Sequence, residues 1–223
     1  MPRITIKTEA LTVNEIEHFL RTFCDRVVAG EQELSDLDSA TGDADHGANL
    51  SRGMRAVTAM LDEGSKYRTP GTLLKEVGMK IVGTVGGSSG ALYGTVFLRL
   101  AAVAGEAEAE VQAQTLAKGL TAAAQGIVDR GRARLGDKTM YDAIKPASDA
   151  FAEQCQAGGG LSQALQAAAL AAEAGARATR NMRARRGKSS YVGDNSIGTV
   201  DPGAESMAWL IRCLADATKL AKS

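Results

Sequence analysis

Aromatic residues, prolines and cysteines are scarce in this sequence, and neither sign of charge is in excess. Lysine and arginine together number 26, as do aspartate and glutamate, so the net charge is zero with neutral histidines. A chain without a basic excess lacks the charge that drives non-specific binding to nucleic acid, so no nucleic-acid partner is predicted. A hydrophobic share of 44% and a charged share of 23% exclude an acidic, disordered tail and indicate a globular protein.

The three cysteines, Cys24, Cys155 and Cys213, are far apart and form no C-x-x-C pair, which argues against a zinc or redox site. Each lies in an apolar stretch, as buried thiols do. The N-terminus alternates Ile4 and Ile6 with charges, and no stretch approaches the roughly 18 uncharged apolar residues of a membrane span. These absences predict a cytoplasmic protein without a membrane segment.

Apolar residues at helical spacing are abundant, and alanine is frequent, which favours helices packed through small side chains. A capping box of Thr12 and Glu15 opens the first helix, and Pro70 stands near the start of another. The spacing predicts eight helices and no convincing strand. Their approximate ranges are 13–27, 47–61, 70–81, 91–104, 111–129, a stretch after 137 that contains Pro146, a stretch from 161 into 177–186, and 202–214.

The segment 36–49 reads D-L-D-S-A-T-G-D-A-D-H-G-A-N and is crowded with carboxylates. Asp38, Asp43 and Asp45 would repel one another if unpaired, and a divalent cation would remove that penalty. Carboxylate oxygens are ligands that Mg²⁺ prefers. The alternative is that the aspartates only cap helices and stabilise turns. His46, directly after them, is either a structural hydrogen-bonding residue or a phosphate donor.

Two further segments are rich in turn-forming residues. The run G-T-V-G-G-S-S-G at 83–90 lies between predicted helices. Its glycines would let backbone N–H groups point into one concavity, and Ser88 and Ser89 would add hydroxyls, which suits a phosphate. A flexible turn is the alternative. The run K-S-S-Y-V-G-D-N-S-I-G-T-V-D-P-G at 188–203 ends on a helix N-terminus, where unpaired N–H groups favour an anion.

Four motifs in this order resemble the ADP-binding L subunit of dihydroxyacetone kinase: G-D-A-D-H-G-A-N, G-G-S-S-G-x-L-Y-G-T, R-G-x-A-x-x-G-D-K-T-M and S-Y-x-G-x-x-S-I-G-x-x-D-P-G-A. Related sugar-kinase subunits share these motifs. The resemblance predicts an N-terminal extension, 1–11, and a single L-type nucleotide-binding domain, 12–223. It implies an all-α fold, a barrel of eight antiparallel helices with a nucleotide and two magnesium ions held by loops at one end. The helix count above agrees with this fold.

Carried over by motif, the resemblance assigns the magnesium ions to Asp38, Asp43 and Asp45. It implies contacts with ADP or ATP from four places. These are the start of the second helix, the glycine run, residues beside the adenine base, and the segment that closes the nucleotide pocket. In that order the nucleotide-binding residues are His46, Gly47, Ala48 and Asn49, then Ser88 and Ser89, then Gly131 and Met140, then Asp201, Pro202 and Gly203. The resemblance also assigns Lys188 to the nucleotide. This residue stands where members of the family often carry arginine, and it keeps the charge but loses the two-pronged hydrogen-bonding geometry.

The mechanism that the resemblance implies is phosphoryl transfer by positioning and charge neutralisation, with no catalytic side chain in this chain. The ketose would be bound by a histidine of a separate K subunit, and a phosphohistidine M subunit of a phosphotransferase system would rephosphorylate the bound ADP. A homodimer is left open. Two alternatives remain: a subunit of a related tetrulose or other ketose kinase that uses free ATP, and a nucleotide-sensing regulatory subunit that transfers nothing.

Overall fold

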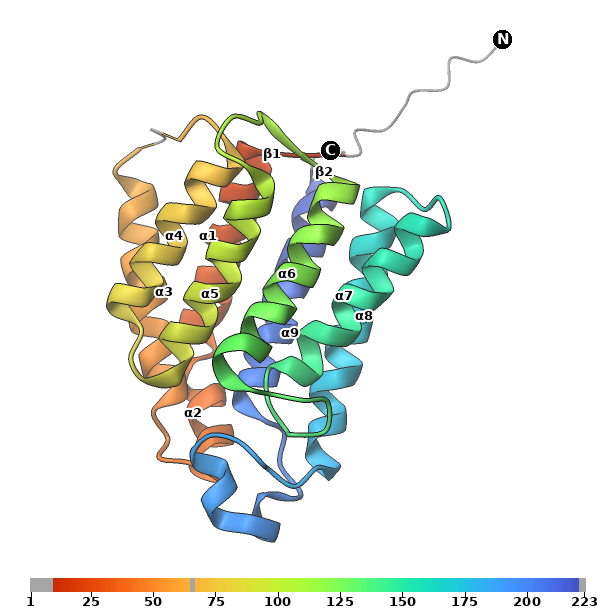
Figure 1. The fold of residues 1–223 in the computed structure, drawn as a ribbon. Coiled ribbons are helices and arrows are strands. Elements are labelled where there is room, and N and C mark those ends of the chain that lie inside the picture. The colour runs from red at the N-terminus through yellow and green to blue at the C-terminus, as the bar shows by residue number, and fades with distance from the viewer. Residues whose placement is uncertain (1–9, 65–66, 221–223) are drawn as a thin grey trace.

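The computed structural model describes residues 10–64 and 67–220, in which long helices lie side by side (Figure 1). The α-helices are α1 (Val13–Ala29), α2 (Glu31–Ser39), α3 (His46–Asp62), α4 (Pro70–Thr84), α5 (Gly87–Ala104), α6 (Ala113–Gly131), α7 (Tyr141–Gln156), α8 (Leu161–Ala178) and α9 (Pro202–Leu220). Strands β1 (Ala10–Thr12) and β2 (Glu110–Gln112) pair antiparallel, and the 3₁₀ helices η1 (Thr179–Asn181) and η2 (Lys188–Ser196) precede α9. The predicted all-α class is confirmed.

Local hydrogen bonds explain where several helices begin. Thr12 and Glu15 form the predicted capping box at α1. Pro70 occupies the start of α4. At α9 the carboxylate of Asp201 accepts a hydrogen bond from the N–H of Ala204 at 2.8 Å. Caps of this kind satisfy N–H groups that have no partner within the helix, and each stabilises a helix by about 1 kcal/mol.

The long helices contact one another in chain order from α3 to α9, and α1 packs against both α3 and α9. Small residues allow the close approach of α7 and α8. Ala164, Ala168 and Ala172 of α8 are fully buried, and a Cβ atom on Gly175 would lie 2.0 Å from the carbonyl oxygen of Asp142 in α7. The abundant alanine therefore serves the close helix packing that the composition predicted.

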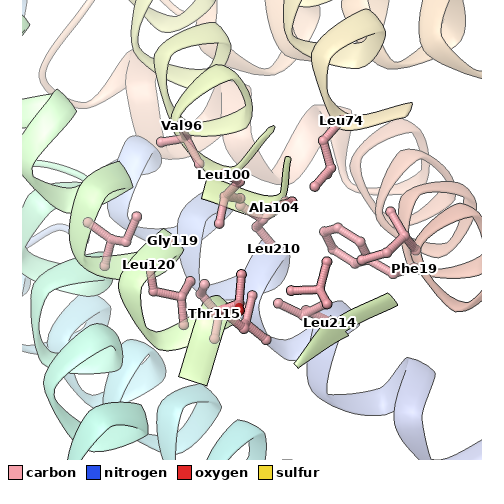
Figure 2. Close-up of a pocket in the computed structure, with 15 residues that line it drawn as sticks. Phe19, Leu74, Val96, Leu100, Ala104, Thr115, Gly119, Leu120, Leu210 and Leu214 are labelled. Carbon is pink, nitrogen blue, oxygen red and sulfur yellow. The ribbon is translucent and has the colours of Figure 1, made fainter. Parts of the chain in front are cut away.

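A small apolar cavity lies among the helices near the paired strands (Figure 2). Its volume is about 30 Å³, and its walls include Phe19 of α1, Leu74 of α4, Leu100 of α5, Leu120 of α6 and Leu214 of α9. A water molecule there would find too few polar partners, so the cavity is expected to be dry.

Helix α2 was not predicted from the sequence. Its only buried apolar side chain is Leu34, so it has no apolar stripe that periodicity could detect. The described residues therefore contain nine α-helices, and the eight that were predicted correspond to α1 and α3–α9. Closure into a barrel of eight antiparallel helices stays a prediction.

The predicted glycine loop, 83–90, is largely helical. α4 continues to Thr84 and α5 begins at Gly87, so only Val85 and Gly86 separate the two helices. Packing of the neighbouring helices outweighs the weak helix propensity of glycine and serine. The first N–H groups of α5 still lack partners within the helix, as phosphate binding requires.

Two helix ends also differ from the prediction. The helix that begins at Leu161 ends at Ala178, before the end of the arginine-rich stretch, and the chain continues into η1. Val111 lies in β2, so α6 begins at Ala113. Three-residue strands such as β1 and β2 are too short to show an alternating pattern in the sequence.

Most of the predicted N-terminal extension, 1–11, lies outside the described residues. Its last two residues, Ala10 and Leu11, belong to β1 and are buried. The boundary between the extension and the domain stays a prediction. Within the described ranges, no helix is long and apolar enough to cross a membrane.

Candidate functional site

The acidic segment forms a cluster of three carboxylates at the end of the helices remote from the paired strands (Figure 1). Asp38 lies near the end of α2, and Asp43 and Asp45 lie in the connection to α3. One oxygen of each carboxylate lies within 4.8 Å of the others. Ala44, between the last two, adopts a φ of 61°, in the left-handed region. The three residues predicted as magnesium ligands are therefore brought together.

Asp38 anchors the connection between α2 and α3. It is 8% exposed, and its Oδ2 accepts hydrogen bonds from the N–H groups of Asp45 at 2.9 Å and His46 at 3.1 Å. These bonds fix the start of α3 relative to the end of α2. The connection that carries Asp43 and Asp45 is thus held beside Asp38 by backbone N–H groups.

The ammonium group of Lys188 lies against the cluster. It contacts Oδ2 of Asp43 and, at 3.3 Å, Oδ2 of Asp45. The hydrogen bond with Asp43 raises the pKa of Lys188 and lowers the pKa of Asp43. All three side chains are exposed, so solvent screens the attraction and it contributes little to stability. The clustered carboxylates already attract the ammonium group of Lys188, and their oxygens are the kind of ligand that Mg²⁺ prefers.

His46 is the first residue of α3 and is buried. Its Nδ1 lies 3.1 Å from Oγ of Ser89, and its Nε2 lies 3.0 Å from Oγ of Ser206. Burial lowers the pKa of the imidazole. Both ring nitrogens therefore face hydroxyl groups of the protein, and a direct contact between the ring and a phosphate stays a prediction.

Ser88 and Ser89 line a cleft from the first turn of α5. The turn before them is tight, because a Cβ atom on Gly90 would lie 2.1 Å from the carbonyl oxygen of Val85. Gly87 has a φ of 65°, which glycine adopts without strain. The turn directs the N-terminal end of α5, the positive end of its dipole, toward the cleft.

Two buried charged groups, Asp201 and Lys138, also line the cleft. Burial raises the pKa of Asp201 to about 7, although the hydrogen bond from Ala204 and the charge of Lys138 oppose the shift. The Nζ of Lys138 donates to the carbonyl oxygens of Thr179, at 2.7 Å, and Thr199. Burial lowers the pKa of Lys138. The two groups thus join the start of α9 to the segments before it.

Sequence reasoning did not select Lys138, although it stands in the motif R-G-x-A-x-x-G-D-K-T-M. The one feature of the sequence that could have indicated a role for Lys138 is that it is a charged residue inside a motif. Its burial depends on carbonyl groups about 40 and 60 residues away, which no local pattern reveals.

The cleft has a volume of about 330 Å³ and is lined by all but three of the predicted site residues. The exceptions are Gly47, Ala48 and Asn49, which lie in the first turn of α3 beside the cleft. A Cβ atom on Gly47 would lie 2.0 Å from the carbonyl oxygen of Glu31, so this glycine permits α3 to pack on α2. Contacts of these three residues with phosphate stay predictions. The cleft is also lined by ten residues that were not among the predicted site residues, namely Gly86, Gly87, Leu92, Ile127, Ala133, Lys138, Thr139, Arg186, Gly187 and Ser189.

The family model described as the DAK2 domain matches residues 40–216 of the chain. The chain belongs to the DAK2 domain family. The Escherichia coli K12 relative named PEP-dependent dihydroxyacetone kinase, ADP-binding subunit DhaL, is 38% identical over 94% of this chain and 99% of its own length. These findings confirm the resemblance to the L subunit that the four motifs indicated.

Two larger proteins match this chain over about a third of their own length. A Triokinase/FMN cyclase of Mus musculus is 33% identical over 96% of this chain, which spans 35% of that relative. The crystal structure of the dihydroxyacetone kinase from C. freundii in complex with AMP-PNP and Mg²⁺ matches with a TM-score of 0.68 and 23% identity. That match covers 97% of this chain and 36% of the other, and it supports the helical fold.

Proposed function

We propose that this chain is the nucleotide-binding subunit of a dihydroxyacetone kinase and holds Mg-ADP or Mg-ATP in the cleft. The observation that carries this proposal is the cluster of three carboxylates beside a cleft that the N-terminal ends of α5 and α9 also line. Carboxylates bind divalent cations, and helix N-termini favour phosphates. A magnesium–diphosphate complex satisfies both. The E. coli relative is an ADP-binding subunit and the C. freundii kinase structure is a complex with AMP-PNP and Mg²⁺, which agrees with it.

Different residues of the cleft would bind different parts of the magnesium–nucleotide complex. Asp38, Asp43 and Asp45 would hold two magnesium ions, which when bound neutralise the charge of the phosphates. The N–H groups at the start of α5 would orient the terminal phosphate. Gly131 and Met140, together with neighbouring apolar residues, would accommodate the base. None of these groups needs to act as an acid, base or nucleophile, because phosphoryl transfer is promoted chiefly by positioning and charge stabilisation.

The phosphoryl group would pass to a ketose on a separate K subunit, and a phosphohistidine protein would be the donor. The chain itself offers no histidine suited to capture a ketose in the cleft. His18 is exposed on α1, and both ring nitrogens of His46 face serine hydroxyls. The E. coli relative, a PEP-dependent kinase subunit that this chain matches over nearly its whole length, supports the same division of labour.

Calorimetric titration of protein freed of bound nucleotide with ADP, with and without Mg²⁺, tests the binding proposal. We expect binding that requires the metal, and no binding under either condition would overturn the proposal. A fresh preparation should also release purine absorbance on denaturation if ADP remains permanently bound. No released purine would contradict permanent binding and would favour exchange of free nucleotide.

A second candidate is the same scaffold in a tetrulose or other ketose kinase that uses free ATP. The similarity to Triokinase/FMN cyclase favours it. A panel of ketoses assayed with the cognate K subunit, with either ATP or a phosphohistidine protein as donor, would separate the two candidates. A regulatory subunit that only senses nucleotide would bind Mg-ADP but support no transfer with any of these substrates.

A further inference from the structure

A buried chain of hydrogen-bonding side chains runs from the interior of the helices to the cleft. The hydroxyl of Tyr93 in α5 donates to Oγ of Ser206 in α9 at 2.8 Å. Ser206 lies 3.0 Å from Nε2 of His46, and Nδ1 of His46 lies 3.1 Å from Oγ of Ser89 at the cleft. Tyr93 and Ser206 are fully buried, so each polar hydrogen in this series of side chains has few alternative hydrogen-bond acceptors.

The proton positions follow from a count of donors around Ser206. Its Oγ lies 2.9 Å from the carbonyl oxygen of Pro202 and 3.2 Å from that of Gly203. Carbonyl oxygens only accept, and a serine has a single O–H, so its proton is directed to Pro202. The remaining two partners, Tyr93 and His46, must then donate to Ser206. His46 therefore carries its hydrogen on Nε2.

The same count determines whether Nδ1, on the other side of the imidazole ring, donates or accepts a hydrogen bond. A neutral ring with its hydrogen on Nε2 can only accept at Nδ1. Burial of the ring between two hydroxyl groups favours the neutral form, although the charges of Asp38 and Asp45 oppose this preference. Ser89 must then donate its hydroxyl proton inward, to Nδ1. That proton is no longer available to a ligand in the cleft.

Ser88 differs from Ser89 in this respect. It lies next to Ser89 in the first turn of α5, is exposed, lines the same cleft and makes no side-chain hydrogen bond within the described residues. We propose that His46, fixed by Ser206 and Tyr93, is a positioning residue that engages the proton of Ser89, so that Ser88 supplies the side-chain donor to a bound phosphate. Ser89 then contributes its backbone N–H. This inference rests on the proposed nucleotide-binding function.

The proton assignment can be read directly, because the chain has only two histidines. Long-range ¹H–¹⁵N NMR spectra of protein labelled in its histidine rings distinguish the two neutral tautomers and the imidazolium form. We expect the Nε2–H tautomer for His46, with exposed His18 as the reference and His46→Gln used to assign the signals. The Nδ1–H tautomer or an imidazolium would overturn the inference. In Ser206→Ala, which removes the acceptor of Nε2–H, we expect a shift toward Nδ1–H.

The role of the two serines is tested with a matched pair of variants. Calorimetric titration with Mg-ADP should show a loss of affinity of about tenfold for Ser88→Ala, the effect of one charge-assisted hydrogen bond. For Ser89→Ala the loss should be about threefold or less. The reverse ranking would overturn the inference. Failure of the unmodified protein to bind Mg-ADP would instead overturn the proposed function, while the tautomer of the free protein would still test the proton assignment.

Discussion

The apolar cavity lies near the paired strands (Figure 2), the cleft lies toward the other end of the helices, and the two are built from different kinds of residue. Apolar side chains from the interiors of several helices line the cavity, whereas helix starts and connecting segments line the cleft. The cleft buries Asp201 and Lys138, and its rim gathers three carboxylates. Burial of apolar surface stabilises the fold, and burial of charge opposes it. We therefore expect stability to depend mainly on the first region and binding on the second.

The largest expected effect on folding comes from the wall of the apolar cavity. Phe19 is 2% exposed and lies on that wall. Phe19→Ala should lower the free energy of unfolding by about 3–5 kcal/mol, because it removes buried contacts and enlarges a cavity that already exists. Urea unfolding followed by circular dichroism measures this change. Phe19→Leu, which keeps most of the volume, should cost about 1.5 kcal/mol or less.

The same variant also tests the separation of the two regions. At a temperature at which Phe19→Ala remains folded, its affinity for Mg-ADP should stay within about twofold of the unmodified protein. A twofold change is about 0.4 kcal/mol, and effects at distant, independent sites are additive within about 0.3–0.5 kcal/mol. A parallel fall in affinity and stability would show that the cleft depends on the packing at the other end.

The converse variant is Asp43→Asn, which removes one anionic oxygen donor from the cluster. We expect the affinity for Mg-ADP to fall about a hundredfold, or roughly 2.7 kcal/mol. Stability should change little, because Asp43 is exposed and loses only a solvent-screened ion pair with Lys188. Asp36→Asn is the control: Asp36 is exposed in α2 and accepts a hydrogen bond from Gln32, outside the cluster. Equal affinities for the two variants would contradict the metal assignment.

The two regions also differ in how far the sequence alone predicts them. Asp38, Asp43 and Asp45 lie within eight consecutive positions, so their proximity could be predicted before any fold was known. Helices with an apolar stripe were predictable for the same reason, whereas α2, with Leu34 as its one buried apolar residue, was not. The contact between His46 and Ser206 joins residues 160 positions apart. Such contacts depend on how α3, α5 and α9 pack, which local spacing does not specify.

A smaller effect, which depends on pH, is expected for Asp201. Its pKa rises from 3.8 to about 7 on folding, so the folded state binds the proton more tightly than the unfolded state. The resulting stabilisation is present below about pH 4 and is lost as the pH rises through 7. Asp201→Asn keeps a helix cap but cannot ionise. Urea unfolding at pH 5 and pH 8 should therefore show a smaller decrease with pH in this variant than in the unmodified protein.

A different result would be informative about Lys138. If the ammonium of Lys138 compensated Asp201 fully, the carboxylate would be charged in both the folded and the unfolded state from pH 5 to pH 8, and Asp201→Asn would change the free energy of unfolding by the same amount at both pH values. Burial lowers the pKa of Lys138, which weakens that compensation. We therefore expect the first outcome.

The smallest expected effect is a gain in stability at the apolar end. Gly119 lies within α6, on the wall of the cavity opposite Leu100 (Figure 2). A Cβ atom there would lie 3.1 Å from Cδ2 of Leu100, the flexible end of a side chain that also borders the empty space. Gly119→Ala should therefore raise the free energy of unfolding by about 0.5–1 kcal/mol, because alanine favours the helix and Leu100 has room to move. Thermal and urea unfolding measure this gain.

Gly175→Ala is the matched control, since it makes the same change inside another helix. Its Cβ atom would lie 2.0 Å from the backbone carbonyl oxygen of Asp142, and a backbone atom cannot move aside without shifting α7 against α8. We expect a loss of about 1–3 kcal/mol, as for overpacked interiors. If both variants lost stability, the walls of the apolar cavity would be as rigid as the contact between α7 and α8. Opposite signs would show that the empty space beside Leu100 absorbs the added methyl group.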